Sequence, residues 1–159
     1  MTLDDFQMLQ NKLYLIGNRV NRSVVTVTGV REGMDIFESP YEASGQASGL
    51  IIGNNGRELL VLTEYEVIRE VKSVRITFID NQTLEAEIKK YDANTGIAIL
   101  KVPVEKISKD TINQIDVAVL GNSLQTRQGK MVVALGSPLG TSYSILTGNI
   151  TSVTNTITT

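Results

Sequence analysis

The residues that could support chemistry in this chain carry oxygen or amine groups only, because its 159 residues include no histidine and no cysteine. No imidazole is available as a general base near neutral pH, and no thiolate is available as a nucleophile. The chain therefore cannot work as a histidine-dependent hydrolase. The usual zinc and iron–sulfur sites are excluded as well. The carboxylates lack the spacing of a calcium loop, so we expect no metal and no cofactor.

Two short motifs are similar to catalytic sequences but lack a residue that the chemistry needs. Gly121-Asn122-Ser123 has the form of a serine-nucleophile motif. Leu124 follows it, where a glycine would let the backbone form an oxyanion hole. Gly129-Lys130 has the form of the end of a phosphate-binding loop, but Leu124 stands at its first glycine position and Met131 at its Ser/Thr position. We interpret both motifs as loops.

Composition excludes several classes of partner. The net charge is −2, tryptophan is absent and aromatic residues make up 5% of the chain. Binding to nucleic acid or to an anionic membrane needs a concentrated basic surface, so we expect neither. No apolar run is long enough to span a bilayer, and the N-terminus lacks the form of a signal peptide. Membrane attachment would therefore require an anchor in a longer parent protein.

The first twenty residues have the pattern of an amphipathic helix. Thr2 and Asp5 have the spacing of a capping box at its start. We expect this helix to pack on the domain, although it could also be the end of a stalk from an upstream segment. Its apolar residues recur at spacings of three and four, which places them on one face: Phe6, Leu9, Leu13, Ile16 and Val20.

From Ser23 onward, the apolar period changes to two, which predicts strands. We expect a polar loop over Arg31–Gln46, one or two helical turns over Glu64–Glu70, and about nine short strands in an all-β barrel or sandwich. The main expected strands are Val25–Thr28, Ala47–Gly53, Glu58–Thr63, Val74–Phe78, Leu84–Lys89, Ile97–Val102, a buried strand at Met131–Leu135 and a long strand at Tyr143–Val153 that is bulged at Gly148.

The last segment is unusual because no charged residue occurs from Met131 to Thr159. An uncharged segment with strong β propensity would invite aggregation if its edge were free. Two explanations remain open: these strands pair with another copy of the chain, or the sequence was cut from a longer protein. We favour the second explanation.

Seven segments, in order, resemble the HtrA type of trypsin-like serine protease. Val61–Ile68 is similar to the family's I-L-T-N-N-H-V segment, and Tyr91–Val102 is similar to its D-x-x-T-D-L-A-x-L-K segment. The order and spacing of the matches carry most of the weight. The other matching segments are Ser23–Val27, Ala47–Gly53, Leu120–Ser123, Gly129–Gly140 and Leu146–Val153.

The resemblance implies a fold and a domain arrangement. An N-terminal helix over residues 1–22 would precede a first six-stranded β-barrel over 23–120, and residues 121–159 would begin an incomplete second barrel. The missing remainder of that barrel would explain the unprotected ending. The family also implies a bacterial protein in an extracytoplasmic place, either the cell surface or a periplasm-like compartment.

The same resemblance locates the positions of a catalytic triad. Glu66 stands where the family has its histidine base, and Gly96 stands where it has the orienting aspartate. The family's nucleophile motif would lie beyond Thr159. A carboxylate is a poor base for a serine hydroxyl at neutral pH. We therefore interpret Glu66 as a solvated carboxylate on a short helix and Gly96 as a strand-entry residue that allows a tight approach.

Three functional hypotheses follow. The first is a catalytically inactive protease domain that binds or scaffolds, through recognition of an extended peptide or protein by strand addition. The second is part of an active serine endopeptidase whose nucleophile lies beyond residue 159 and whose base is Glu66 or a lysine. The third is an oligomerisation module that exchanges its C-terminal strands between copies.

Overall fold

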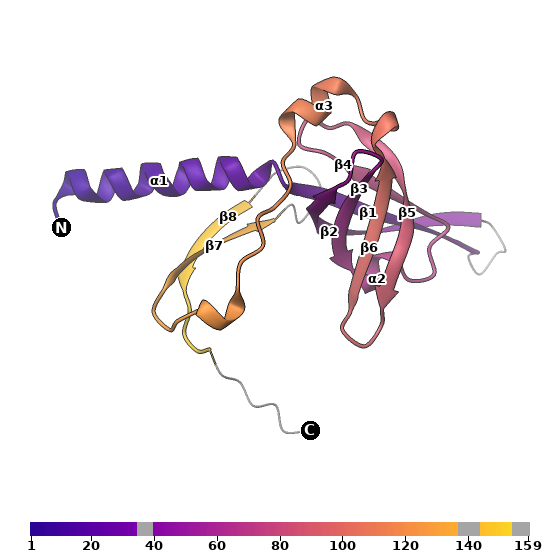
Figure 1. Ribbon diagram of the computed structural model, residues 1–159. Coiled ribbons are helices and arrows are strands. Elements are labelled where there is room, and N and C mark those ends of the chain that lie inside the picture. Colours follow the sequence, from indigo (N-terminus) through magenta and orange to yellow (C-terminus); the bar gives the residue numbers. More distant parts are fainter. Residues whose placement is uncertain (35–39, 137–143, 154–159) are drawn as a thin grey trace.

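The computed structural model describes residues 1–34, 40–136 and 144–153. A closed six-stranded antiparallel barrel stands beside a long N-terminal helix and a two-stranded sheet (Figure 1). The predicted all-β class with an N-terminal helix is confirmed. The elements are α1 Leu3–Asn21, β1 Val24–Met34, β2 Pro40–Asn54, β3 Glu58–Glu64, α2 Tyr65–Ile68, β4 Ser73–Thr77, β5 Thr83–Asp92, β6 Ile97–Pro103, the 3-10 helix Val104–Lys106, α3 Lys109–Gln114, the 3-10 helix Ser123–Gln125, β7 Met131–Gly136 and β8 Ser144–Asn149.

The barrel closes in the strand order β1-β2-β3-β6-β5-β4. Its interior is filled by one side of each strand, since successive side chains along a strand point to opposite faces. β6 lies between β3 and β5 and pairs with both along its length, as expected for a central strand. The fully buried interior side chains include Val25, Val27, Ile51, Val61, Ile76, Phe78 and Leu100.

The first hairpin is much longer than the sequence predicts. β1 continues through Met34 and β2 starts at Pro40, with an unbroken register from Val30 opposite Ser44 to Met34 opposite Pro40. The prediction of a loop over Arg31–Gln46 is therefore wrong for both described ends of that segment, while residues 35–39 lie outside the described residues. Backbone pairing with the neighbouring strand stabilises these polar residues as strand, despite their weak intrinsic preference.

The β4–β5 hairpin matches its prediction except at one position. Val74, Ile76 and Phe78 are buried, and Leu84 and Ala86 pack against the core. Ile88 is the next residue in the same alternation of β5, but its side chain is 42% exposed. The register between β5 and β6 shifts between Ile88 and Lys90, which interrupts the inward and outward alternation of β5 at this point.

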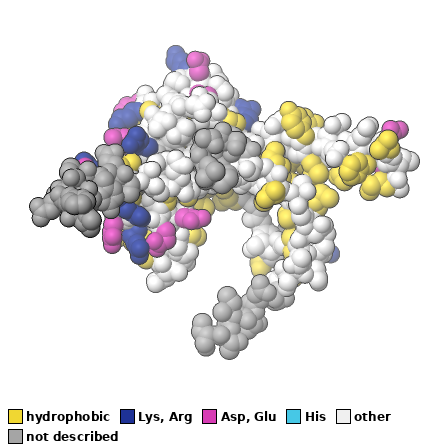
Figure 2. Space-filling view, turned by 180° about the vertical axis from the view of Figure 1, so that it is seen from behind, with side chains coloured by type: hydrophobic (Ala, Val, Ile, Leu, Met, Phe, Trp, Pro, Cys, Tyr) yellow, Lys and Arg dark blue, Asp and Glu magenta, His cyan; other side chains and the backbone are white. Residues whose placement is uncertain are grey.

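The helix α1 begins as predicted but is not packed on the barrel. Thr2 and Asp5 form the capping box. Gly17 and Asn21 are its buried residues, while Phe6 and Ile16 remain 47% and 48% exposed. Figure 2 shows hydrophobic side chains along this projecting helix, whereas charged side chains gather over the barrel. The helix contacts the β7–β8 hairpin instead, where a Cβ placed on Gly17 would lie 2.5 Å from Ile145 Cδ1.

β7 and β8 form an exposed hairpin beside α1. The prediction that β7 is buried is wrong, since Met131 and Val132 are 49% and 42% exposed. β8 is shorter than the predicted strand over Tyr143–Val153, of which Tyr143 lies outside the described residues. The register runs without a shift through Val132 opposite Gly148, so the predicted bulge is absent from this described ladder. Among the described residues, no third strand pairs with this hairpin.

A short helix, α3, lies in the polar stretch that follows β6. Ser108 caps it, accepting a 3.1 Å hydrogen bond from the Thr111 backbone. Thr111 is fully buried, and its hydroxyl donates to the Asp80 carboxylate in the β4–β5 turn. Further along, Val117–Leu120 forms no strand, although the Ala118 N–H donates to the Ile51 carbonyl at 2.8 Å. The domain limits at residues 22 and 120 stay predictions.

Candidate functional site

The fold brings the two predicted site positions to one end of the barrel. α2 follows directly from β3, and its first N–H, that of Tyr65, donates to the Gly96 carbonyl at 2.8 Å. The Tyr65 ring also stacks on Tyr91 of β5, with ring centroids 4.9 Å apart and the planes inclined by 20°. Glu66 is the next residue along the chain. Positions 66 and 96, thirty residues apart in sequence, are therefore neighbours in the structure.

The Glu66 carboxylate is exposed and ion-paired within its own helix. Its side chain is 65% exposed, and its Oε2 lies 3.4 Å from Nε of Arg69. Arg31 of β1 stabilises this helix, because its guanidinium donates hydrogen bonds to the carbonyls of Glu66 and Arg69 at 2.8 and 3.0 Å. These are the carbonyls at the C-terminal end of α2, where a cation is favoured. The geometry agrees with the prediction of a solvated carboxylate.

Gly96 occupies its position because of backbone conformation. Its φ is +72°, in the left-handed region that favours glycine. A Cβ added to Gly96 would meet no atom within 4 Å. The prediction of a tight approach is therefore wrong, and the turn between β5 and β6 is the reason for the glycine. This turn is closed by the Gly96 N–H, which donates to the Asp92 carbonyl at 3.0 Å.

One carboxylate lies in the same turn, but its acceptor oxygens already have donors. Asp92 accepts hydrogen bonds from the Asn94 N–H at 2.9 Å and from the Thr95 hydroxyl at 3.0 Å. These two donors, the Asn94 backbone first, hold the pKa of Asp92 below its ordinary value. The carboxylate thus caps the turn. It does not take over the role of the aspartate that is absent at position 96.

A groove of about 400 Å³ lies between the outer wall of the barrel and β7. Its walls are mostly apolar, including Val24, Leu50, Leu62 and Leu135, and Glu64 and Gly96 are also among the lining residues. Sequence reasoning did not find this groove. The outward alternation of Leu60, Leu62 and Glu64 along β3 was the available signal, because apolar residues on an outer barrel face require a covering partner. The groove can hold an apolar or extended ligand, but it brings together no acid–base pair.

The other sequence motifs supply no chemistry to this region. Asn122 of the Gly121-Asn122-Ser123 motif accepts a 2.9 Å hydrogen bond from the Leu124 N–H and caps a 3-10 turn. Within residues 1–34, 40–136 and 144–153, no group of three acidic, histidine or cysteine side chains could hold a metal ion. None of the helices in these ranges is long and apolar enough to cross a membrane.

Comparison with known proteins decides the family. Residues 47–159 match the sequence profile described as the trypsin-like peptidase domain. The chain belongs to this family. Its HtrA-type character agrees with the curated relatives, which include a Serine protease Do-like HtrA of Lactococcus lactis, 27% identical over 131 residues, and the chloroplastic Protease Do-like 1 of Arabidopsis thaliana, 29% identical over 136 residues. Each match covers 82% of this chain.

The fold of this trypsin-like domain also agrees with solved structures. An HtrA-type protease with a decapeptide superposes with a TM-score of 0.73 at 17% identity, over 88% of this chain and 45% of the other. The chain spans 30% and 28% of the length of the two curated relatives. Relatives are named as periplasmic, mitochondrial and chloroplastic proteins, so the family does not specify one compartment.

Proposed function

We propose that this chain is a catalytically inactive HtrA-type trypsin-like domain with a binding or scaffolding role. The observation that carries the proposal is the pair of positions joined by the Tyr65–Gly96 hydrogen bond. A triad needs a base that accepts the nucleophile's proton and an acidic group that orients that base. At this place the chain has Glu66, which is exposed and paired with Arg69, and a glycine without a side chain.

The first test measures nucleophile reactivity. The longest natural polypeptide that contains this sequence is treated with a serine-directed fluorophosphonate probe, and we expect no labelling above that of the heat-denatured protein. Labelling that disappears when one serine is replaced would overturn the proposal. In that case, the peptidase rates of the parent and of its Glu66→Gln variant would show whether Glu66 serves as the base.

A binding role is supported by an unpaired strand edge. β2 pairs with β1 from Pro40 onward, but its pairing with β3 begins only at Leu50. Among the described strands, none pairs with the other edge of β2 around Ser44, Gly45 and Gln46, and these three residues are exposed. An extended peptide can add to such an edge through its main chain. Two HtrA-type neighbours were solved with peptides, one a decapeptide and one a tripeptide.

The second test therefore maps peptide binding. A soluble octapeptide of alternating valine and threonine is titrated into the isotope-labelled chain, and we expect the amide resonances of Ser44, Gly45 and Gln46 to shift. The matched control is the same peptide with its amides N-methylated on alternate residues, because it cannot donate along one edge. Equal shifts with both peptides, or shifts confined to other strands, would argue against strand addition at β2.

Location and self-association complete the proposal. We infer an extracytoplasmic location from the family resemblance, which fractionation of the native cells checks directly. The exposed β7–β8 hairpin supports pairing between copies through the C-terminal strands, because Met131 and Leu146 are 49% and 69% exposed. Sedimentation velocity at several concentrations tests this pairing. A strict monomer with an ordered β8 would rule it out.

A further inference from the structure

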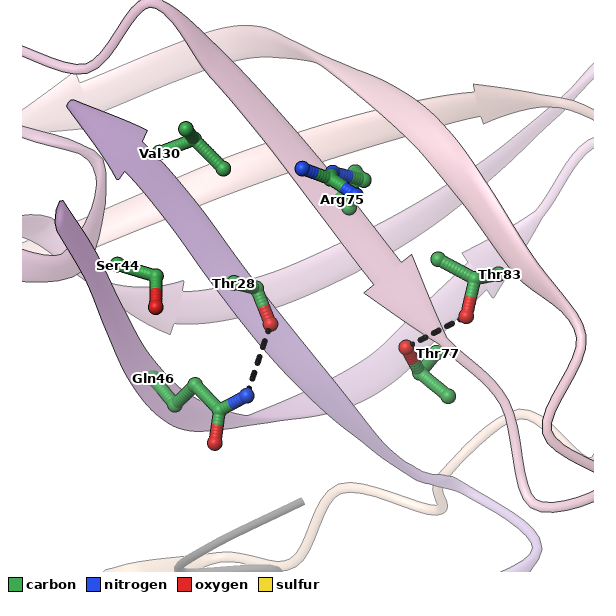
Figure 3. Close-up of a pocket in the computed structure, with 7 residues that line it drawn as sticks. All are labelled: Thr28, Val30, Ser44, Gln46, Arg75, Thr77 and Thr83. Atoms are coloured by element: carbon green, nitrogen blue, oxygen red, sulfur yellow. Dashed lines mark hydrogen bonds between the residues drawn. The ribbon is translucent and has the colours of Figure 1, made fainter. Parts of the chain in front are cut away.

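A polar hollow of about 410 Å³ lies on the outer wall of the barrel, where the β1–β2 hairpin adjoins β4 and β5. It is formed at the outward positions of four neighbouring strands, β2, β1, β4 and β5 (Figure 3). Its volume falls within the range of small-molecule sites. Val30 is its apolar lining residue, and the polar ones are Thr28, Ser44, Gln46, Arg75, Thr77 and Thr83.

The strand register brings a cation and hydroxyl groups into this hollow from separate parts of the sequence. Gln46 and Arg75 both lie directly opposite Thr28, on the two strands that flank β1. One row across the sheet therefore reads amide, hydroxyl and guanidinium. Thr77 lies opposite Thr83 in the next row toward the β4–β5 turn. Because side chains of one row share a face, these groups converge on one space.

Internal hydrogen bonds leave donors available to a ligand. The Gln46 amide donates to the Thr28 oxygen at 3.4 Å, so the Thr28 hydroxyl keeps its own hydrogen for another acceptor. The hydroxyls of Thr77 and Thr83 lie 2.9 Å apart, and one of them donates to the other. The accepting hydroxyl of that pair also keeps its hydrogen. Figure 3 shows both bonds between residues that line the hollow.

The charge of Arg75 is not neutralised by the described residues. Its side chain is exposed, and no described carboxylate lies within 4 Å of its guanidinium. Glu85 is its cross-strand neighbour on β5, but it does not line the hollow. By contrast, the nearby Lys72 is paired with Glu32. The Arg75 guanidinium thus offers a planar fork of donors next to free hydroxyl donors.

We infer that this hollow is a binding site for a carboxylate group of a polypeptide, either an acidic side chain or a chain terminus. The two carboxylate oxygens accept from the Arg75 fork, and the hydroxyls of Thr28 and of the Thr77–Thr83 pair donate to the remaining lone pairs. A planar acceptor with two oxygens suits the fork geometry of arginine. The site is independent of the proposed loss of peptidase chemistry, because it shares no residue with α2 or with the β5–β6 turn.

The test is a titration of the full isotope-labelled chain, followed by NMR. The probes are N-acetyl-aspartate N-methylamide, for a side-chain carboxylate, and a hexa-alanine peptide with a free C-terminus, for a terminal one. The neutral controls are the asparagine analogue and the amidated peptide. We expect a dissociation constant on the order of 1 mM for at least one acid, as for a small open site. The amides of Thr28, Thr77 and Thr83 should shift, and neither neutral control should shift them.

Variants separate this site from general attraction to positive charge. Arg75→Gln should weaken binding at least tenfold, and Arg75→Lys should give an intermediate value because it keeps the charge but loses the fork. Arg57→Gln removes the same charge from the exposed β2–β3 turn and should leave binding unchanged. Unchanged melting temperatures establish that the variants remain folded. Equal binding by the Arg75→Gln variant and the unsubstituted chain, or tighter binding of inorganic phosphate than of either acid, would overturn the inference.

Discussion

The contact between Gly29 of β1 and the short helix α2 predicts that a larger side chain at this position would destabilise the protein. A Cβ built on Gly29 would lie 1.9 Å from the Val67 carbonyl oxygen and 2.9 Å from Val71 Cγ1. An ordinary contact needs roughly 3.4 Å, so the carbonyl would have to retreat by more than about 1 Å. Val67 and Ile68 are buried, and displacing α2 would loosen both. Gly29→Ala should therefore lower the free energy of unfolding by about 3 kcal/mol.

The chain contains a matched control for this change. Gly45 lies directly opposite Gly29 in the β1–β2 ladder, yet a Cβ on Gly45 would meet no atom within 4 Å. Neither glycine has a positive φ, so alanine fits both backbones. Gly45→Ala should leave stability unchanged or raise it by up to about 1 kcal/mol, since alanine reduces the entropy of the unfolded chain.

Urea unfolding of the two variants measures the difference directly. In thermal unfolding, the Gly29→Ala loss corresponds to a fall in melting temperature of roughly 6 to 12 °C for a chain of this size. The Arg31 hydrogen bonds to α2 should weaken too, which faster exchange of the α2 amides would report. Equal stabilities for the two alanine variants would refute the claim that α2 is seated against Gly29.

Three further predictions concern charge, the triad positions and a buried hydroxyl. The hydrogen bond from the Lys89 ammonium is the main reason why the pKa of Glu58 lies below its ordinary value of 4.5. The stability from this pair is therefore present above pH 4.5 and is lost as the pH falls through the lowered pKa. When the urea midpoint is plotted against pH, Glu58→Gln should make the decrease on the acid side shallower. The Glu66→His variant should be folded and inactive. Adding Gly96→Asp to it should raise the pKa of the introduced imidazole by about 1, measured by NMR titration, because a carboxylate nearby favours the charged imidazolium. Identical titration curves for the single and double variants would show that positions 66 and 96 are not neighbours. Thr111→Val should cost about 1–3 kcal/mol in urea unfolding because it removes the hydroxyl that donates to Oδ2 of Asp80 and leaves that carboxylate with only the Gln82 N–H as donor among the described residues. A loss below about 0.5 kcal/mol would contradict that role.

Local pattern was a good guide where one face of an element is buried. The alternation of Val74, Ile76 and Phe78 predicted their burial, and the capping box at Thr2 predicted the start of α1. The sequence pattern gave wrong predictions where the secondary structure or burial of a segment depends on which other segment it contacts. The described ends of the Arg31–Gln46 segment are strands because each pairs with the other. The apolar face of α1 is largely exposed because the helix meets the hairpin instead of the barrel.

For the candidate site, the sequence by itself determined which chemistry is absent. The lack of histidine follows from composition alone, and the family resemblance places Glu66 and Gly96 at the triad positions, because both depend only on which residues the chain carries. Only the tertiary structure decided what those residues do instead. The +72° φ of Gly96, the capping role of Asp92 and the convergence of Arg75 with three threonines arise from turns and strand register. The convergence of Arg75 with the threonines joins residues from three strands, and spacing along the sequence does not give the distances between them.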